Sequence, residues 1–238
     1  MEKILYADHI RINDVISIYI PTVGEVCDAE DEYFAAVSMI VSTPYDMIVQ
    51  LDDAGVDFST IDTYELFCMM FSSLQKIDTR LIFGDLDLAK FELMMNEKTE
   101  ELVFYDRTNG VVIDKAIHTQ IRDELRRLLQ LKKNEKKPGN EEGRKYMIKI
   151  ARMQQRRQRR EAKAKTTSQL EDIIISLVNT SEFKYDYQTI RDISIYQLYL
   201  SMNQIQHKIQ FDNIMSGYYA GTIKHEDLRK EDKTWIRL

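Results

Sequence analysis

Cysteine, proline and glycine are all scarce in this sequence of 238 residues, which contains two Cys, three Pro and eight Gly. Cys27 and Cys68 form no CxxC pair and have no neighbouring histidine cluster, so neither a disulfide framework nor a zinc site is supported. We therefore expect a protein of a reducing cytoplasm. Scarce Gly and Pro, together with abundant Met, Leu, Ile, Glu and Lys, favour helices over an all-β sandwich.

Long hydrophobic runs are missing as well. The longest apolar stretches, such as residues 173–178, are far shorter than the ~20 residues that a membrane-spanning helix requires. Met1 is followed by charged residues rather than by the apolar segment of a signal peptide. The sequence therefore predicts no membrane contact and no secretion.

Motifs of catalysis and metal binding are absent from the printed sequence. The histidines are dispersed, without HExxH spacing, and no glycine-rich phosphate loop occurs. The paired carboxylates lie at Asp52, Asp53 and Asp57 and at Asp85 and Asp87. Asp85 and Asp87 lack the Gly and the terminal Glu of a calcium loop, and Asp53 precedes Gly55 at a predicted helix end, where solvated acids are ordinary. We expect no enzyme, no cofactor and no metal site, although a site assembled from distant residues would escape such a search.

The charges that are present are unevenly distributed. Residues 132–165 contain fourteen Lys or Arg and four Glu, a local charge of +10, whereas residues 1–131 carry −14 and residues 166–238 carry −2. We predict a mainly α fold with a small β component. It divides into an acidic α+β lobe (1–131), a linker with a basic helix (132–165) and an all-α C-terminal lobe (166–238).

Two β regions are expected in the first lobe. Isoleucines at positions 10, 12, 16, 18 and 20 would share one face of an extended chain, which predicts a strand or hairpin closed by Pro21. Short β-prone runs at 91–95, 102–106 and 111–113 are separated by turn residues, including Asn109-Gly110. These runs predict a small antiparallel meander.

Helices are expected between and after these strands. The pattern predicts helices from residue 28 or 29 to 41, from Thr43-Pro44 to Gly55, over 62–75, and after an Asp114 N-cap to about 131. Pro138-Gly139-Asn140 marks a linker, and residues 144–165, which lack Gly and Pro, predict a helix. Further helices are expected over 168–178 and from a capping box at Ser194 and Gln197 to Gly217 and Gly221.

The basic run of the predicted middle helix is the candidate partner-binding site. Helical spacing places most of its cations on one stripe, which suits an acidic protein face or a row of phosphates. The candidate residues are Arg152, Arg156, Arg157, Arg159, Arg160 and Lys163. A contact with an acidic protein, including a second copy of the chain, is the preferred interpretation, because the lobes are acidic and no aromatic ladder accompanies the arginines. A nucleic-acid-binding regulator and a solvated linker helix are the alternatives.

Several motifs together resemble tail-morphogenesis proteins of phages and prophages of Gram-positive hosts, most of all tail assembly chaperones. In the first lobe these are IPTVGE at 20–25, EYF at 32–34, TPYDM at 43–47, LDDAGVDF at 51–58 and YELF at 64–67. In the second lobe they are ISIYQLY at 193–199, GYYAG at 217–221 and Trp235. The long basic connection at 132–165 departs from this pattern.

The resemblance implies a non-enzymatic protein of the bacterial host cytoplasm. Such a protein binds the helical tape-measure protein, keeps it soluble and helps tail-tube subunits polymerise around it. Other tail proteins and further copies of the chain are expected partners. Because the basic connection at 132–165 departs from the family pattern, a structural component of the virion tail or baseplate is an alternative function.

Overall fold

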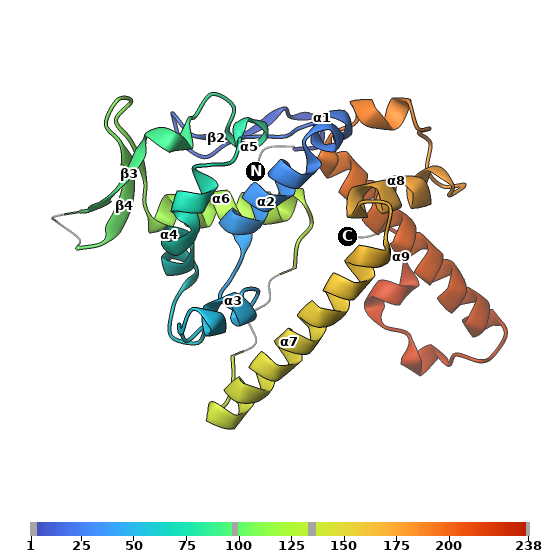
Figure 1. Ribbon diagram of the computed structural model, residues 1–238. Coiled ribbons are helices and arrows are strands. Elements are labelled where there is room, and N and C mark those ends of the chain that lie inside the picture. Colours follow the sequence, from blue (N-terminus) through green and yellow to red (C-terminus); the bar gives the residue numbers. More distant parts are fainter. Residues whose placement is uncertain (1–3, 97–99, 133–136, 237–238) are drawn as a thin grey trace.

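The computed structural model describes residues 4–96, 100–132 and 137–236 and is mainly helical, with two small sheets (Figure 1). Its α-helices are α1 (Val23–Asp28), α2 (Glu30–Val41), α3 (Ile48–Asp53), α4 (Thr63–Leu74), α5 (Arg80–Phe83), α6 (Lys115–Leu128), α7 (Glu141–Ala164), α8 (Gln169–Val178) and α9 (Ile195–Tyr219). The 3-10 helices are η1 (Ile4–Tyr6), η2 (Leu88–Lys90), η3 (Thr189–Asp192), η4 (His225–Asp227) and η5 (Lys230–Lys233). The predicted fold class is confirmed.

The strands form a hairpin and a meander. Strands β1 (His9–Arg11) and β2 (Ser17–Tyr19) pair antiparallel with Ile10 opposite Ile18, both buried. Strands β3 (Phe91–Met95), β4 (Leu102–Asp106) and β5 (Val111–Ile113) form an antiparallel sheet in the order β3-β4-β5. The predicted hairpin and the predicted meander are both confirmed. Alternating apolar residues and short turns specify such local strand pairing. Residues 97–99, between the first two of the predicted β-prone runs, lie outside the described residues.

Most of the predicted helix starts are confirmed by their caps. The Asp62 carboxylate accepts hydrogen bonds from the N–H groups of Tyr64 and Glu65 at the start of α4. The Asp114 carboxylate accepts from Ile117 at the start of α6, and Ser194 forms a capping box with Gln197 at the start of α9. These side chains satisfy backbone donors that have no partner within their own helix.

The predicted helix start at Thr43-Pro44 is wrong. The Thr43 backbone N–H and hydroxyl both donate to the Asp46 carboxylate at 2.8 Å, and the Asp46 N–H donates to the Thr43 carbonyl. This closed turn delays the helix, so α3 begins at Ile48 and ends before Gly55, whose φ is +72°. Helix α1 was missed, although Thr22 and Glu25 have the spacing of the capping box that starts it.

The hydrophobic core continues from the first predicted lobe into the last. A single cluster of buried side chains reaches from Ile4 to Leu198. Two backbone hydrogen bonds join residues 21–23 to residues 193–195. The Val23 N–H donates to the Ile193 carbonyl, and the Ile195 N–H donates to the Pro21 carbonyl. At Gly24 a Cβ would lie 3.1 Å from the Arg191 carbonyl, so glycine permits this close approach. The division of the chain into lobes stays a prediction.

Candidate protein-binding surface

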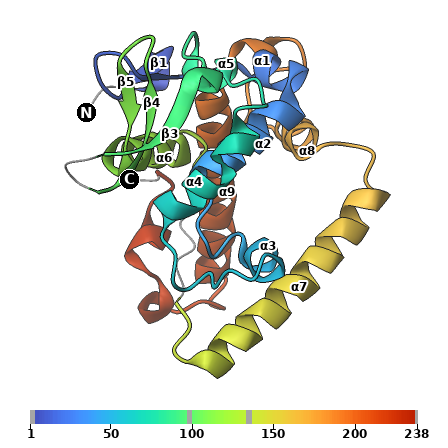
Figure 2. The same ribbon diagram turned by 60° about the vertical axis from the view of Figure 1, so that its left-hand side comes forward.

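Helix α7 lies along the edge of the molecule (Figures 1 and 2). It begins where the Asn140 side chain accepts a hydrogen bond from the Gly143 N–H at 2.8 Å. It then runs without interruption to Ala164, in agreement with the predicted helix over 144–165. The first part of α7 lies beside α3, and its C-terminal end leads to α8. Residues 133–136 of the predicted linker lie outside the described residues.

The first half of α7 packs on α3 through a small apolar cluster. Met147, Ile148 and Ala151 cover Ile48, Leu51, Phe58 and Leu66. Beside this cluster, the Arg152 guanidinium donates to the carboxylates of Asp52 and Asp53, both at 2.6 Å. These hydrogen bonds raise the pKa of Arg152, so the arginine keeps its charge. Arg152, a predicted partner-binding residue, is therefore engaged within the chain.

The second half of α7 carries the remaining predicted cations. Arg156, Arg159 and Arg160 are exposed and make no ion pair within the described part of the chain. Arg157 is bonded to Glu161 one helical turn later, at 2.7 Å. Lys163 is in α7, but its side chain lies outside what the structure describes. The structure thus divides the predicted stripe into an anchored Arg152 and three exposed arginines.

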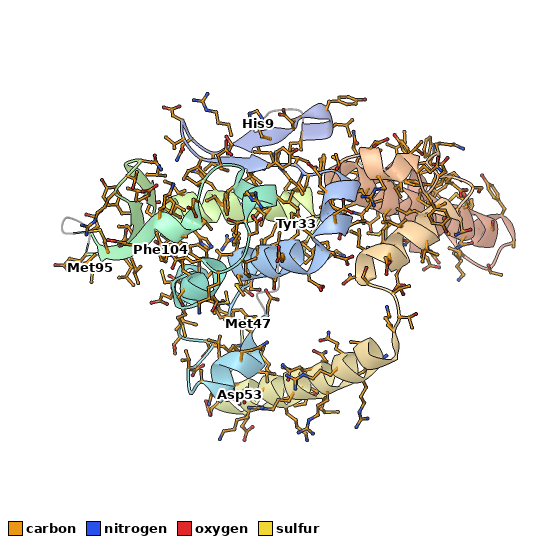
Figure 3. All side chains as sticks on the ribbon, turned by 45° about the horizontal axis from the view of Figure 1, so that its top comes forward. His9, Tyr33, Met47, Asp53, Met95 and Phe104 are labelled. Carbon is orange, nitrogen blue, oxygen red and sulfur yellow. The ribbon has the colours of Figure 1, made fainter. Side chains whose placement is uncertain are left out.

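An apolar groove lies close to the end of α7. It has a volume of about 410 Å³ and lies between α2, the segment after α6, α8 and α9. Its apolar lining consists of Phe34, Val37, Val41, Leu129, Leu131, Leu170 and Tyr199. Two acidic residues, Glu30 and Asp31, also line the groove. In Figure 3, α7 runs below α2, with α3 near one end of α7 and the α7–α8 connection at the other end. In the sequence these apolar residues look like ordinary core positions, so the sequence pattern did not reveal the groove.

The connection from α7 to α8 is attached directly to the groove. The Ser168 hydroxyl donates to the Glu30 carboxylate at 2.7 Å, and Lys165 donates to Asp172 at 2.6 Å. Arg160 precedes the end of α7 by four residues, or ~6 Å along a helix. The arginine-bearing half of α7 is therefore joined to the groove along the chain, through this short connection.

Replacement of Ser168 by alanine is expected to lower the free energy of unfolding by ~1 kcal/mol. The hydroxyl caps α8 by accepting from the Glu171 N–H at 3.0 Å, and the variant loses this bond together with the bond to Glu30. The melting temperature should fall by ~2–4 °C in calorimetry. Ser176→Ala is the matched control, because the exposed Ser176 hydroxyl bonds only within α8. Equal melting temperatures for the two variants would contradict the assigned cap.

The groups with chemical reactivity are spread out or buried. Among the described residues no cluster of three or more His, Cys, Asp or Glu could hold a metal ion. Burial raises the pKa of both thiols, that of Cys68 to about 11, which suppresses the nucleophilic thiolate. His118 is buried and its Nε2 lies 3.1 Å from the Ile40 carbonyl oxygen. The exposed arginines and the apolar groove are features of binding.

None of the helices in the described ranges is both long and apolar enough to cross a membrane. Exposed apolar side chains include Leu93, Met95 and Leu102 of the β3-β4 hairpin. Met95 is 59% exposed there, whereas Met94 and Tyr218 are half-buried.

The family model described as YomV second domain matches residues 161–237, from the last turn of α7 through α8 and α9. This family is of a phage or prophage type, and the match supports a phage-derived protein. No curated protein and no solved structure matches the chain. The match agrees with the phage character indicated by the sequence motifs.

Proposed function

We propose that the chain is a non-enzymatic phage tail-morphogenesis protein that binds the tape-measure protein in the host cytoplasm during tail assembly. The observation that carries the proposal is the apolar groove between α2, α8 and α9, which a short connection joins to the α7 half that bears three exposed arginines. The phage-type family match over residues 161–237 supports the biological setting.

The groove and the arginines suit an amphipathic helix. Apolar side chains at helical spacing would fill the lining around Phe34, Val37 and Leu170, as in other helix-in-groove contacts. Acidic groups on the flank of that helix would pair with Arg156, Arg159 and Arg160. A long helical protein that exposes apolar residues before assembly has this chemistry, and covering those residues keeps it soluble.

Charge reversal of the exposed arginines is the test. In co-expression with the tape-measure protein, the variant Arg156→Glu/Arg159→Glu/Arg160→Glu should retain roughly tenfold less of it in the soluble complex. The side chains are exposed, so the variant should fold normally. Soluble tape-measure protein is quantified after affinity purification of this chain.

The matched control reverses three exposed cations elsewhere, in Lys184→Glu/Lys224→Glu/Lys230→Glu, and changes the net charge equally. It should retain the wild-type amount of partner. If the tape-measure protein is equally soluble and unbound with and without this chain, the proposal fails. Recovery of the chain from purified particles would instead identify a structural tail or baseplate component.

Nucleic-acid binding is a second candidate, because the same three arginines are exposed and make no ion pair within the described residues. Filter binding of DNA and RNA over a salt series separates the two functions. Phosphate contacts predict an affinity that falls steeply as salt rises, with a shallower dependence in the triple-Glu variant. No binding at low salt removes this candidate.

A further inference from the structure

Strand β3 is at the edge of the β3-β4-β5 sheet, and no other strand of the described residues pairs with its outer side. The Asn96 N–H donates to the Glu101 carbonyl, so in this antiparallel ladder the positions bonded to β4 are 96, 94 and 92. Phe91, Leu93 and Met95 therefore direct their N–H and C=O groups away from β4. The Gln75 side chain donates to the Phe91 carbonyl at 2.8 Å, which agrees with a Phe91 carbonyl that points away from β4.

The free part of this edge is short and apolar. Leu93 is 50% exposed, Met95 is 59% exposed, and Leu102, which faces Met95 across the hairpin, is 39% exposed. Figure 3 shows Met95 near the outer end of the hairpin and Phe104 nearer the helices. Residues 91–96 contain no Lys, Pro or bulge, the devices that usually protect an edge strand. The single charge, Glu92, forms an ion pair with Arg107 at 3.2 Å.

We infer that this edge pairs with the same edge of a second copy of the chain. An antiparallel register centred on Met94 places Leu93 of one copy opposite Met95 of the other, and the reverse. The outward N–H and C=O groups of these two residues then make four intermolecular hydrogen bonds. The two sheets become one six-stranded sheet with a two-fold axis at Met94, the commonest symmetry of homodimers.

The side chains support a second copy rather than an unrelated strand. Leu93, Met95 and Leu102 lie on one face of the hairpin, and the two-fold axis joins this face to the same face of the other copy. Met94 opposes Met94, and Glu92 opposes Asn96, so no like charges face each other across the new ladder. The edge is thus complementary to itself in hydrogen bonding, apolar surface and charge.

Sedimentation over a range of concentrations tests the dimer. The wild type should approach twice the chain mass of 28.1 kDa. Met95→Lys places a charge at the apolar edge of each copy and should weaken dimerisation at least roughly tenfold. Met69→Lys is the matched control, because Met69 is 50% exposed on α4 and lies outside the hairpin. A wild type that remains monomeric at every concentration overturns the inference.

Disulfide crosslinking tests the register, which a dimer formed elsewhere would not reproduce. Met94→Cys should crosslink to itself under mild oxidation, because paired Cα atoms at such non-hydrogen-bonded positions lie ~4.5 Å apart. Glu92→Cys lies on the same face but opposes Asn96, so it should crosslink at least roughly tenfold more slowly. Native Cys27 and Cys68 are the same in both variants. Equal crosslinking rates would overturn the assigned register and, with it, the inferred interface.

Discussion

Replacement of Phe104 by alanine is expected to lower the free energy of unfolding by ~3–5 kcal/mol, the largest effect of any single substitution considered for this protein. Phe104 is 1% exposed, and its ring stacks on Phe71 with ring centroids 3.7 Å apart. Phe67 contacts it edge-on at 5.5 Å. The variant loses both the transfer free energy of the ring and its aromatic contacts, and the rigid neighbours close the resulting cavity only partly.

Urea denaturation followed by circular dichroism measures this loss. Val112→Ala on the neighbouring strand β5 is the control, because Val112 is 36% exposed and should cost less than ~1 kcal/mol. A similar small loss for Phe104→Ala would contradict the packing of the sheet against α4 and α6.

Acidification from pH 6.5 to 4 is expected to lower the free energy of unfolding by ~3 kcal/mol through His118 alone. Burial lowers the pKa of His118 to about 4, from an ordinary value of 6.5. Between these pH values the unfolded chain binds a proton that the folded chain does not bind. Stability therefore falls as the pH drops through this window, and the loss is complete below the folded pKa.

The environment of His118 explains this shift. Its Nε2–H donates to the Ile40 carbonyl, while Nδ1 is buried without a hydrogen-bond partner among the described residues. The ring also stacks on Phe67 with centroids 4.1 Å apart. A second proton on the imidazole would therefore be placed in apolar surroundings without an acceptor.

Comparison with His118→Leu isolates this contribution from the carboxylates that also titrate in acid. The wild type should be more stable than the variant at pH 7, because leucine leaves the Ile40 carbonyl unpaired. This difference should narrow by ~3 kcal/mol at pH 4. Parallel pH profiles of the two proteins in urea denaturation would show that His118 does not cause the acid sensitivity.

Local signals in the sequence were sufficient for most secondary structure. The strand ranges 91–95, 102–106 and 111–113 agree with β3, β4 and β5, and the caps at Asp114 and Ser194 agree with α6 and α9. Cap and strand patterns depend on neighbours within a few residues, so they can be read without the fold. The exceptions include helix α1, which was missed, and Thr43, where Asp46 three residues later closes a turn in place of a helix.

The candidate binding surface was predicted only in part. The basic stripe was evident from composition, but Arg152 could not be separated from Arg156 by sequence, since both are arginines at helical spacing. Only the packing of α7 on α3 brings Asp52 and Asp53 to Arg152, across about 100 residues of chain. The groove is also tertiary in origin, because its lining comes from four separate parts of the chain.

The sequence by itself determined the mainly helical class, the hairpin and meander, and the concentration of positive charge in one uninterrupted helix. Each follows from short-range periodicity, capping or composition. The tertiary structure decided which arginines of α7 stay exposed, which apolar residues of α2, α8 and α9 border a groove, and which edge of the sheet is free. These properties depend on contacts between segments that are distant in the chain. Because hydrophobic burial is non-directional, a local sequence pattern does not specify which distant segments come into contact.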